Sequence, residues 1–528
     1  MSQVASTSLA TSTPAHADAR GGGAPPRAGR REWLALAVLM LPVLLVSIDN
    51  TVLSFALPQI SQDLGPSATQ LLWIVDIYAL LLAGLLVTMG TLGDRVGRRL
   101  LLLVGAAGFG LVSVYAAFAT DAGQLIVARA LLGVFGATLM PSTLALLRST
   151  FLDAGQRRLA IAVWAAAFSG GSALGPVVGG WLLEHFWWGS VFLINVPVLA
   201  VLLVTAPLLL RESRGTRAGR FDLVSVALSI LAMLPLVFGI KTIVHDGVTG
   251  VGIGALAVAI ASGVLFVRRQ LRRDEPLLDV RLFTRGVFTA SVLANLLAVF
   301  ALAGLVFYVS QYLQLVLGLE PMDAGLRLVP GALAAIAMGL LAVVLARHAP
   351  LYVLVPAGLL LSAAGYALAT TLTSTSEATI VVVFALVGAG AGLAETLTND
   401  AILASVPTER AGAASAISET AYELGAATGV AVLGSVLSAT YRGALDLPAG
   451  LSAEQATTAT ETLGGAVAVA GEVPFGEAVL DAAREAFSRG VDLTSAIGAV
   501  ILVGAAIVTA ILLRRATRTG GRAVAGAR

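Results

Sequence analysis

Long apolar segments separated by short polar ones alternate along almost the whole chain. A helix needs about 20 mainly apolar residues to cross a hydrocarbon layer of roughly 30 Å, and in lipid it satisfies its own backbone polar groups. The pattern therefore predicts fourteen membrane-spanning helices. The predicted spans are 33–57, 70–90, 100–119, 124–147, 159–181, 190–210, 222–242, 250–268, 288–317, 326–346, 351–371, 379–404, 413–439 and 494–514.

The composition supports an all-α integral membrane protein. Of the 528 residues, 57% are hydrophobic and 12% are charged, and the mean hydropathy is +0.91. A water-soluble domain cannot bury so much apolar surface. The chain has no cysteine, which excludes disulfides, iron–sulfur clusters and thiol catalysis, and its four histidines do not cluster in the sequence. We therefore expect no metal site and no bound cofactor.

The positive charges predict an orientation in the membrane. With the N-terminus in the cytoplasm, 27 of the 33 basic residues fall on the cytoplasmic side of the predicted spans, as the positive-inside rule requires. The six others are Arg129, Lys241, Arg327, Arg442, Arg484 and Arg489. We expect both termini to lie in the cytoplasm and the protein to reside in a bacterial cell membrane.

The spans divide the chain into several parts. We expect a disordered tail (1–31), a six-helix bundle (32–210), an extra helix pair with linkers (211–287), a second six-helix bundle (288–514) and a basic tail (515–528). The second bundle includes an acidic outer loop at 441–492. The sequence favours a solvated linker with one amphipathic helix near Ala478 to Phe487, and a lid that attracts cations is the alternative.

A glycine-rich polar segment follows the second predicted span. It contains Gly90, Asp94, Arg95, Gly97 and Arg98. Glycines let two helices turn sharply, and an aspartate beside arginines can form a charge network that breaks and re-forms between two bundles. The alternative is a chance aspartate in a basic loop. The segment resembles the G-x-L-a-D-r-x-G-r-[RK] signature of the major facilitator superfamily, which implies two six-helix bundles and, here, two extra central helices.

The fifth span carries a second glycine-rich pattern. Its members are Gly171, Gly175, Pro176, Gly179 and Gly180. Proline removes a backbone donor and small residues admit a close helix neighbour, so a kinked packing helix is expected in any case. The pattern is similar to the G-x(3)-G-P-x(2)-G-G motif of proton-coupled exporters in the same superfamily. This resemblance implies export.

Asp49 lies well inside the first predicted span. An ionised carboxylate is costly there and must be protonated, hydrated or paired. The surrounding S-I-D-N-T-V and A-L-P residues resemble a motif of the fourteen-span drug:proton antiporters, the QacA- and LfrA-like multidrug exporters. Arg129 in the fourth span matches the basic residue of a further family motif. We expect Asp49 to carry a proton. We expect Arg129 to adjust the proton affinity of Asp49 by pairing with it in one conformation.

Further acidic residues with aromatic neighbours lie in two other spans. In the second span, Asp76 lies between Trp73 and Tyr78; this pattern can hold an organic cation, and the alternative is an interfacial aromatic belt with a hydrated aspartate. In the thirteenth, Glu419 and Glu423 are one helical turn apart and flank Tyr422. We expect them to exchange a proton for a cation, and a hydrated helix face is the alternative.

The segment around the two glutamates resembles the E-x-x-x-[DE]-L-G pattern of QacA-like exporters. Glu395 in the twelfth span is a further candidate, and we expect it to lie deeper than Asp400. Some relatives that export divalent cations carry an acidic residue in the tenth span. That span is apolar here after Arg327, so the sequence favours monovalent substrates.

Taken together, the resemblance implies a proton-coupled antiporter. Its expected partners are protons, membrane lipid and cationic hydrophobic small molecules such as quaternary ammonium compounds and dyes. We expect a monomer without enzymatic activity, nucleic-acid partner or cofactor, driven by the proton gradient. A dedicated exporter of one self-made antibiotic or siderophore is the alternative. An ATP-driven pump is disfavoured because the only lysine, Lys241, lacks the preceding glycine loop of a nucleotide site.

Overall fold

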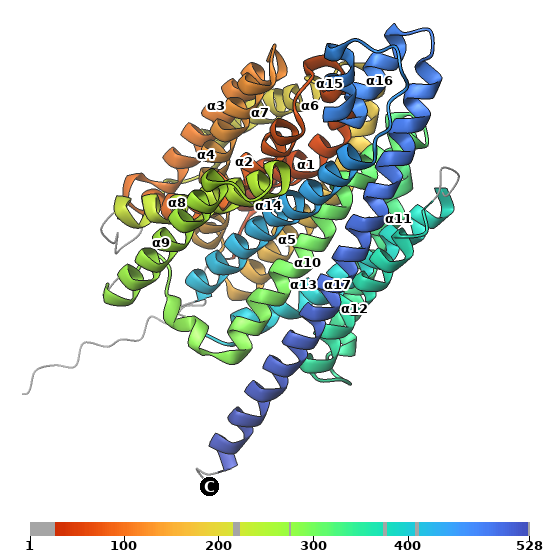
Figure 1. Cartoon of the computed structure of the whole chain (residues 1–528). Coiled ribbons are helices and arrows are strands. Elements are labelled where there is room, and N and C mark those ends of the chain that lie inside the picture. Colours follow the sequence, from red (N-terminus) through yellow and green to blue (C-terminus); the bar gives the residue numbers. More distant parts are fainter. Residues whose placement is uncertain (1–26, 215–221, 274–275, 373–376, 407–410, 526–528) are drawn as a thin grey trace, which may run out of the picture.

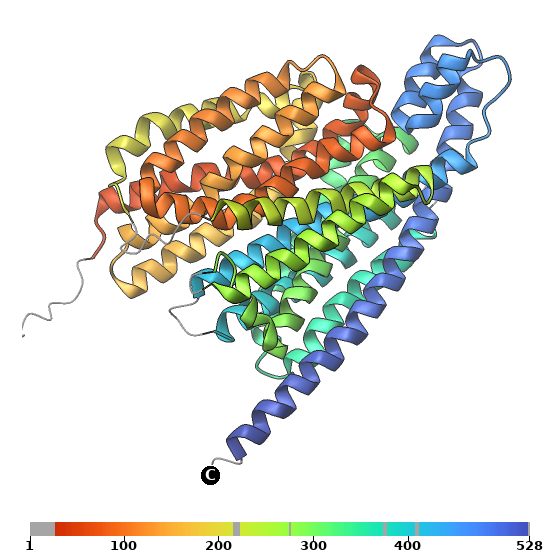
Figure 2. The same ribbon diagram turned by 60° about the vertical axis from the view of Figure 1, so that its left-hand side comes forward.

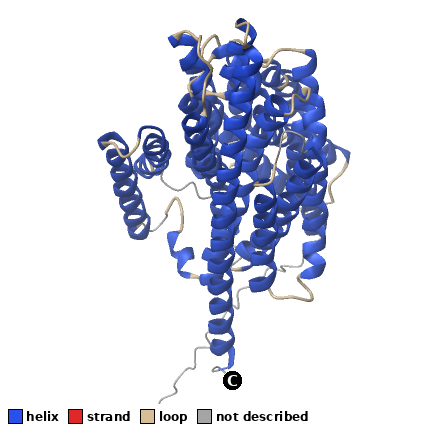
Figure 3. Cartoon of the chain, turned by 45° about the vertical axis from the view of Figure 1, so that its right-hand side comes forward, coloured by secondary structure: helices blue, strands red, loops and turns tan. Residues whose placement is uncertain are grey.

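The structure, a computed structural model, describes residues 27–214, 222–273, 276–372, 377–406 and 411–525. Within these ranges every regular element is a helix (Figure 3). Thirteen of the helices described are long and apolar enough to span a membrane, and a bent fourteenth brings the count to that predicted. Most of the predicted N-terminal tail lies outside the described residues.

The N-terminal half is a helical bundle drawn in red to yellow in Figure 1. Within it, α2 packs on α4, α1 on α5, and α3 on both α4 and α7. Its helices are α1 (Arg30–Leu64), α2 (Ala68–Val96), α3 (Arg98–Ala117), α4 (Ala122–Thr150), α5 (Ala154–His185), α6 (Ser190–Leu193) and α7 (Asn195–Leu209). Side-chain caps define several helix starts, since Ser67 accepts from the Gln70 amide and Asp121 from the Gln124 amide.

The C-terminal half repeats this arrangement. α11 packs on α13, α10 on α14, and α12 on both α13 and α17, so each pairing in the first bundle has a counterpart in the second. The helices are α10 (Gly286–Gln311), η2 (Tyr312–Val316), α11 (Pro321–Leu345), α12 (Leu351–Ala369), α13 (Glu377–Ala404), α14 (Ala411–Ala444) and α17 (Gly476–Ala525). The halves are joined mainly by the packing of α2 on α14 and of α5 on α11, with a smaller contact between α1 and α10.

Two extra helices, α8 (Leu223–Asp246) and α9 (Gly250–Arg272), form a hairpin between the halves. In Figure 2 this yellow-green pair runs along the junction of the two bundles. α8 contacts both α2 and α14, and a short helix, η1 (Val280–Thr284), leads on to α10. The extra pair predicted from the sequence therefore covers the seam between the two halves.

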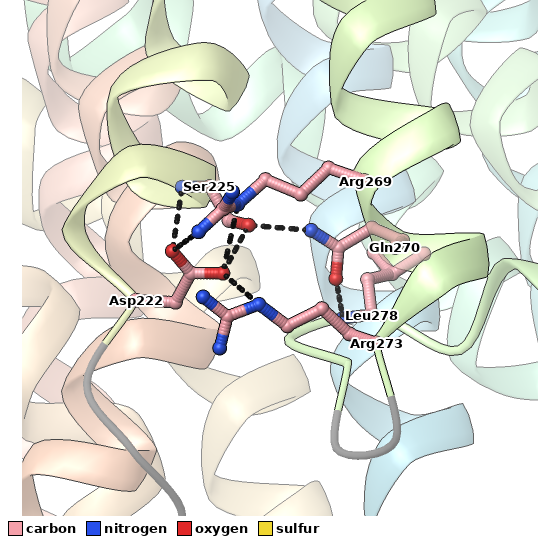
Figure 4. A network of polar contacts seen from close by, with 6 residues as sticks. All are labelled: Asp222, Ser225, Arg269, Gln270, Arg273 and Leu278. Carbon is pink, nitrogen blue, oxygen red and sulfur yellow. Dashed lines mark hydrogen bonds and ion pairs between the residues drawn. The ribbon is translucent and has the colours of Figure 1, made fainter.

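A polar network holds α8 and α9 together at one end (Figure 4). Asp222 caps α8, and its carboxylate lies 2.9 Å from the Arg269 Nη2 and 3.2 Å from the Arg273 Nε. Ser225 donates to the same carboxylate at 2.6 Å. Burial raises the pKa of Asp222, but hydrogen bonds from Arg269 and Ser225 outweigh it and hold this pKa well below its usual range.

The fifth span is bent. α5 changes direction by 42° between its segments Gly155–Ser172 and Leu174–His185. Pro176 has no N–H to donate to the carbonyl four residues earlier, that of Ser172, so the break falls where the hydrogen bond is missing. The predicted proline kink is therefore present in α5.

The segment predicted as a long outer loop is largely helical. Two short helices, α15 (Ala453–Glu461) and α16 (Leu463–Glu472), precede α17, which includes the helix predicted near Ala478 to Phe487. α16 packs against α1 and α17, and Glu461 accepts a hydrogen bond from the Ala68 amide at 2.9 Å. We call α15 and α16 the helical cap. The interpretation as a solvated linker is wrong for α15 and α16, which are too short to be stable as isolated helices.

The two ends of the bundle differ in charge. We call the end with the helical cap the loop end, and the opposite end, where Arg98, Arg148 and Arg285 lie, the basic end. α17 extends from the loop end, where it begins beside the helical cap, past the basic end and beyond the bundle (Figure 1). Its last turns occupy most of the segment predicted as a C-terminal tail, up to Ala525.

Candidate cation and proton site

Asp49 and Arg129 form a buried ion pair in the N-terminal half. The Arg129 Nη1 lies 2.7 Å from the Asp49 Oδ2, and both side chains are at most 2% exposed. Arg129 also donates from Nε to the Ile74 carbonyl at 3.1 Å, and its guanidinium lies 4.3 Å from the centre of the Tyr78 ring. One arginine from α4 thus ties α1 to α2, and its planar group satisfies all three contacts at once.

The acidic residues of the C-terminal half approach this pair. Glu423 on α14 is 2% exposed, interacts with the Asn50 side chain, and lies within electrostatic reach of Arg129 and Glu419. Glu395, from α13, is within reach of Tyr422. Glu395 and Glu419 are half-buried, whereas Asp400 is exposed. The structure therefore places Glu419 and Glu423 near the Asp49–Arg129 pair and links Glu395 to them through Tyr422, whereas Asp400 lies outside this group.

Tyr422 lies at the boundary of the two halves. Its ring meets the Phe168 ring of α5 edge-on, with centroids 5.8 Å apart, and Phe168 stacks on Trp164. Tyr422 is also within electrostatic reach of Glu395, Glu419 and Glu423. Aromatic rings beside carboxylates are the surroundings that an organic cation prefers.

Asp76 belongs to a different cluster. The Lys241 ammonium of α8 lies 2.7 Å from the Asp76 Oδ2, and both side chains are at most 1% exposed. The same ammonium is 4.2 Å from the centre of the Trp73 ring. This burial contradicts the alternative of a hydrated aspartate in an interfacial belt. The predicted Trp73, Asp76 and Tyr78 group is also divided, because Tyr78 lies against Arg129 and Trp73 against Lys241.

Sequence reasoning missed the role of Lys241. The sequence did contain an indication of this role. Lys241 is the only lysine and lies in the last turns of an otherwise apolar span. A buried ammonium group requires a counter-charge. The sequence could not name the partner because α2 and α8 are far apart along the chain. The contact between them is tertiary.

The glycine-rich segment expected to follow the second span begins inside α2, which extends to Val96, and ends in a tight turn at Gly97 at the basic end. Gly97 has φ +120°, and a Cβ placed on it would lie 2.7 Å from the Glu212 carboxylate carbon. Arg98 donates from Nε to Asp94 at 2.8 Å, while exposed Arg95 lies one residue beyond that aspartate. Glu212, which the sequence did not single out, accepts from the Arg99 amide at 2.9 Å and fixes the start of α3.

The glycines of α5 face two different neighbours. A Cβ on Gly171 would lie 2.8 Å from the Ser47 Cβ, and one on Gly179 would lie 2.8 Å from the Val52 Cγ2; Gly175 abuts Thr51 between them. This face of α5 therefore packs on the α1 turn that carries Asp49. On the other face, a Cβ on Gly180 would lie 2.6 Å from the Pro321 carbonyl, and Gly325 of α11 abuts Pro176. The pattern thus joins the Asp49 helix to the other half.

Comparisons with known proteins agree with this architecture. The chain is 53% identical over 492 residues to the "Multidrug efflux pump LfrA" of Mycolicibacterium smegmatis, covering 93% of this chain and 98% of that protein. It is 41% identical to the "Methyl viologen resistance protein SmvA" of Salmonella typhimurium, covering 90% and 97%. A crystal structure of a bacterial homologue of the human lysosomal transporter Spinster, inward-facing and unoccupied, has the same fold at 17% identity, with a TM-score of 0.65 and coverage of 92% and 98%.

A family model also covers most of the membrane region. The model described as Major Facilitator Superfamily matches residues 39–430, from the first turns of α1 into α14. This range includes both glycine-rich patterns, the Asp49–Arg129 pair and the acidic residues of α13 and α14. The protein belongs to the major facilitator superfamily of transporters.

Proposed function

We propose that this transporter exports cationic amphiphilic drugs in exchange for protons, by alternating access between its two halves. The observation that carries the proposal is the position of the Asp49–Arg129 pair of one half against the Glu423 group of the other. One chain supplies both sides of this site, so we expect a monomer to suffice. In line with the positive-inside rule, we propose that the basic end and both termini lie in the cytoplasm.

Competition between protons and drug for the same carboxylates would couple proton entry to drug export. Glu419 and Glu423 are a helical turn apart on α14, so when both are ionised they repel, and either a proton or an organic cation relieves that repulsion. A cation binding from the basic end displaces protons, and protons arriving from the loop end displace the cation. Each proton moving down 100 mV supplies roughly 2.3 kcal/mol. The proton gradient is then the energy source, and no cofactor is required.

The relatives support drugs as the substrate class. One is named a multidrug efflux pump and another a methyl viologen resistance protein. Methyl viologen is a dication, whereas we propose monovalent cations as the better substrates here. Two features support this preference: α11 carries no charged residue after Arg327, and the Asp76 carboxylate is neutralised by Lys241.

Efflux of ethidium from cells and everted vesicles tests the proposal. Wild-type efflux should stop when a protonophore removes the gradient, and Asp49→Asn and Glu423→Gln should abolish it. Asp400→Asn is the matched control, because Asp400 lies outside the cluster on α13. In vesicles, adding ethidium should release protons from the acidified lumen. If Asp49→Asn still exports ethidium in a proton-dependent manner, the proposed coupling fails; if no cationic dye is exported by wild type, an exporter of one self-made product becomes the better interpretation.

A further inference from the structure

The Asp76, Trp73 and Lys241 cluster has the composition of an organic-cation site that is already filled. A carboxylate and an indole face approach one ammonium group, at 2.7 Å from the carboxylate oxygen and 4.2 Å from the ring centre. Besides this contact, neither Asp76 nor Lys241 has a hydrogen-bond partner among the described residues. These surroundings are those of a bound primary ammonium ligand, but here the ammonium belongs to the protein.

The cluster lies on the seam between the two halves. α8, which carries Lys241, contacts α2 of one half and α14 of the other. A small apolar cluster joins the three helices beneath it through Leu80, Val237 and Ala431. Towards the loop end, a pocket adjoins Lys241, lined by Ala68, Thr69, Leu72, Ser435, Ser438 and Arg442. The site is thus separate from the Asp49 and Glu423 group.

We infer that Lys241 is a built-in occupant of an alkylammonium-binding site formed by Asp76 and Trp73, and that its charge keeps exogenous cations out of this site. The inference rests on the proposed function only in naming cations as the substrates. Coulomb attraction and the indole face do not distinguish a lysine side chain from a free alkylammonium ion of the same length. Lys241 differs only in being tethered to α8, and this tether gives it a high effective concentration at the site relative to ligands in solution.

Removal of the Lys241 side chain should open the site. Lys241→Ala deletes the atoms beyond Cβ, which have the size and charge of n-propylammonium. The purified variant should bind n-propylammonium at least about tenfold more tightly than wild type does, and the ligand should raise its thermal unfolding midpoint. 1-Propanol has the same size without the charge and should do neither. Lys241→Arg retains a tethered cation and is the matched control that should not respond.

A second substitution, at Asp76, tests whether its carboxylate binds the ligand. In Lys241→Ala combined with Asp76→Asn, binding of n-propylammonium should return to the wild-type level. Equal binding to Lys241→Ala with and without Asp76→Asn, or no gain in Lys241→Ala, would overturn the inference. If Lys241→Ala is not recovered folded, n-propylammonium during extraction should restore its recovery, and failure of that rescue also overturns the inference. These are binding measurements, so a failure of dye export would leave them unaffected.

Discussion

Asn50 and Glu423 face each other across the boundary between the two halves of the transporter. Asn50 follows Asp49 on α1, whose carboxylate lies 2.7 Å from Arg129. One short stretch of α1 therefore contacts a basic residue of its own half and an acidic residue of the other. Glu423 is also within electrostatic reach of Arg129, so a change of its protonation acts on the charge that pairs with Asp49.

This contact leads to a first prediction. Asn50→Asp places a second carboxylate against Glu423, and two like charges about 4 Å apart repel by several kcal/mol at a partly buried site. We expect ethidium efflux to fall roughly tenfold or more. Asn50→Ser keeps a hydrogen-bonding group and should retain most of the activity. Initial efflux rates at matched expression measure both variants, and wild-type efflux from Asn50→Asp would contradict a role for this contact in transport.

The packing of α5 on α1 supplies a second prediction. In Gly179→Ala the new Cβ lies 2.8 Å from the Val52 Cγ2, while the next atoms are at 3.5 and 3.6 Å. Overpacking of this kind costs about 1–3 kcal/mol, so thermal stability and efflux should both decrease. Val52→Ala removes the obstructing methyl group and should restore both in the double variant.

Gly170→Ala is the control for this pair, because nothing lies within 4 Å of a Cβ at that position. It should behave like wild type in melting curves of the purified protein. A loss in Gly179→Ala that Val52→Ala does not repair would mean that Gly179 is needed for more than close packing.

Two glycines of the segment at the basic end should differ in their tolerance of substitution by alanine. Gly97 has φ +120° and abuts Glu212, so Gly97→Ala should lower stability by about 1–3 kcal/mol through backbone strain. Gly90→Ala places its Cβ 3.6 Å from the Pro141 Cβ, an ordinary contact, and should be tolerated. Melting temperatures in detergent decide the matter; equal effects at both positions would refute the conformational explanation for Gly97.

The network that closes the α8–α9 hairpin predicts a pH dependence. The pKa of Asp222 is lowered in the folded protein despite its burial, because Arg269 and Ser225 stabilise its charged form. The resulting stability is therefore present above the unfolded pKa of about 3.9 and is lost as the pH falls below it. Asp222→Asn should melt below wild type at pH 7, and the difference should shrink towards pH 3.

Asp153→Asn is the control for the pH series, since it exchanges one good N-cap for another at the start of α5. Its melting temperature should follow that of wild type over the same range. A constant difference between Asp222→Asn and wild type from pH 7 to pH 3 would show that the ionised Asp222 contributes nothing specific.

The sequence was sufficient to predict the membrane-spanning helices, because each must be apolar and long enough to cross the hydrocarbon layer. The pairing of Asp49 with Arg129 was predicted from two charges within apolar spans together with the resemblance of both segments to family motifs. The bend in α5 followed from Pro176 alone. These features depend on local chemistry or on a strong constraint from the membrane.

The remaining features depend on tertiary contacts. Nothing in the local sequence of Lys241 names Asp76, and nothing near Gly97 names Glu212. The division of Trp73 and Tyr78 between two clusters follows from the rotation of α2 relative to α4 and α8, which residue spacing does not determine. The helical cap was missed because its stability derives from packing on α1 and α17 and only weakly from its own helix propensity.

The length of α17 has a mechanical consequence. A continuous helix of 50 residues measures about 75 Å along its path at 1.5 Å per residue, more than twice the hydrocarbon thickness of roughly 30 Å. α17 packs on α12 and α14 of the C-terminal half, so a rocking motion of that half moves the two projecting ends of α17 as well. One end carries α16, where Gly464 abuts Ser61 of α1. The same stroke that parts the halves at the loop end must therefore pull this joint open.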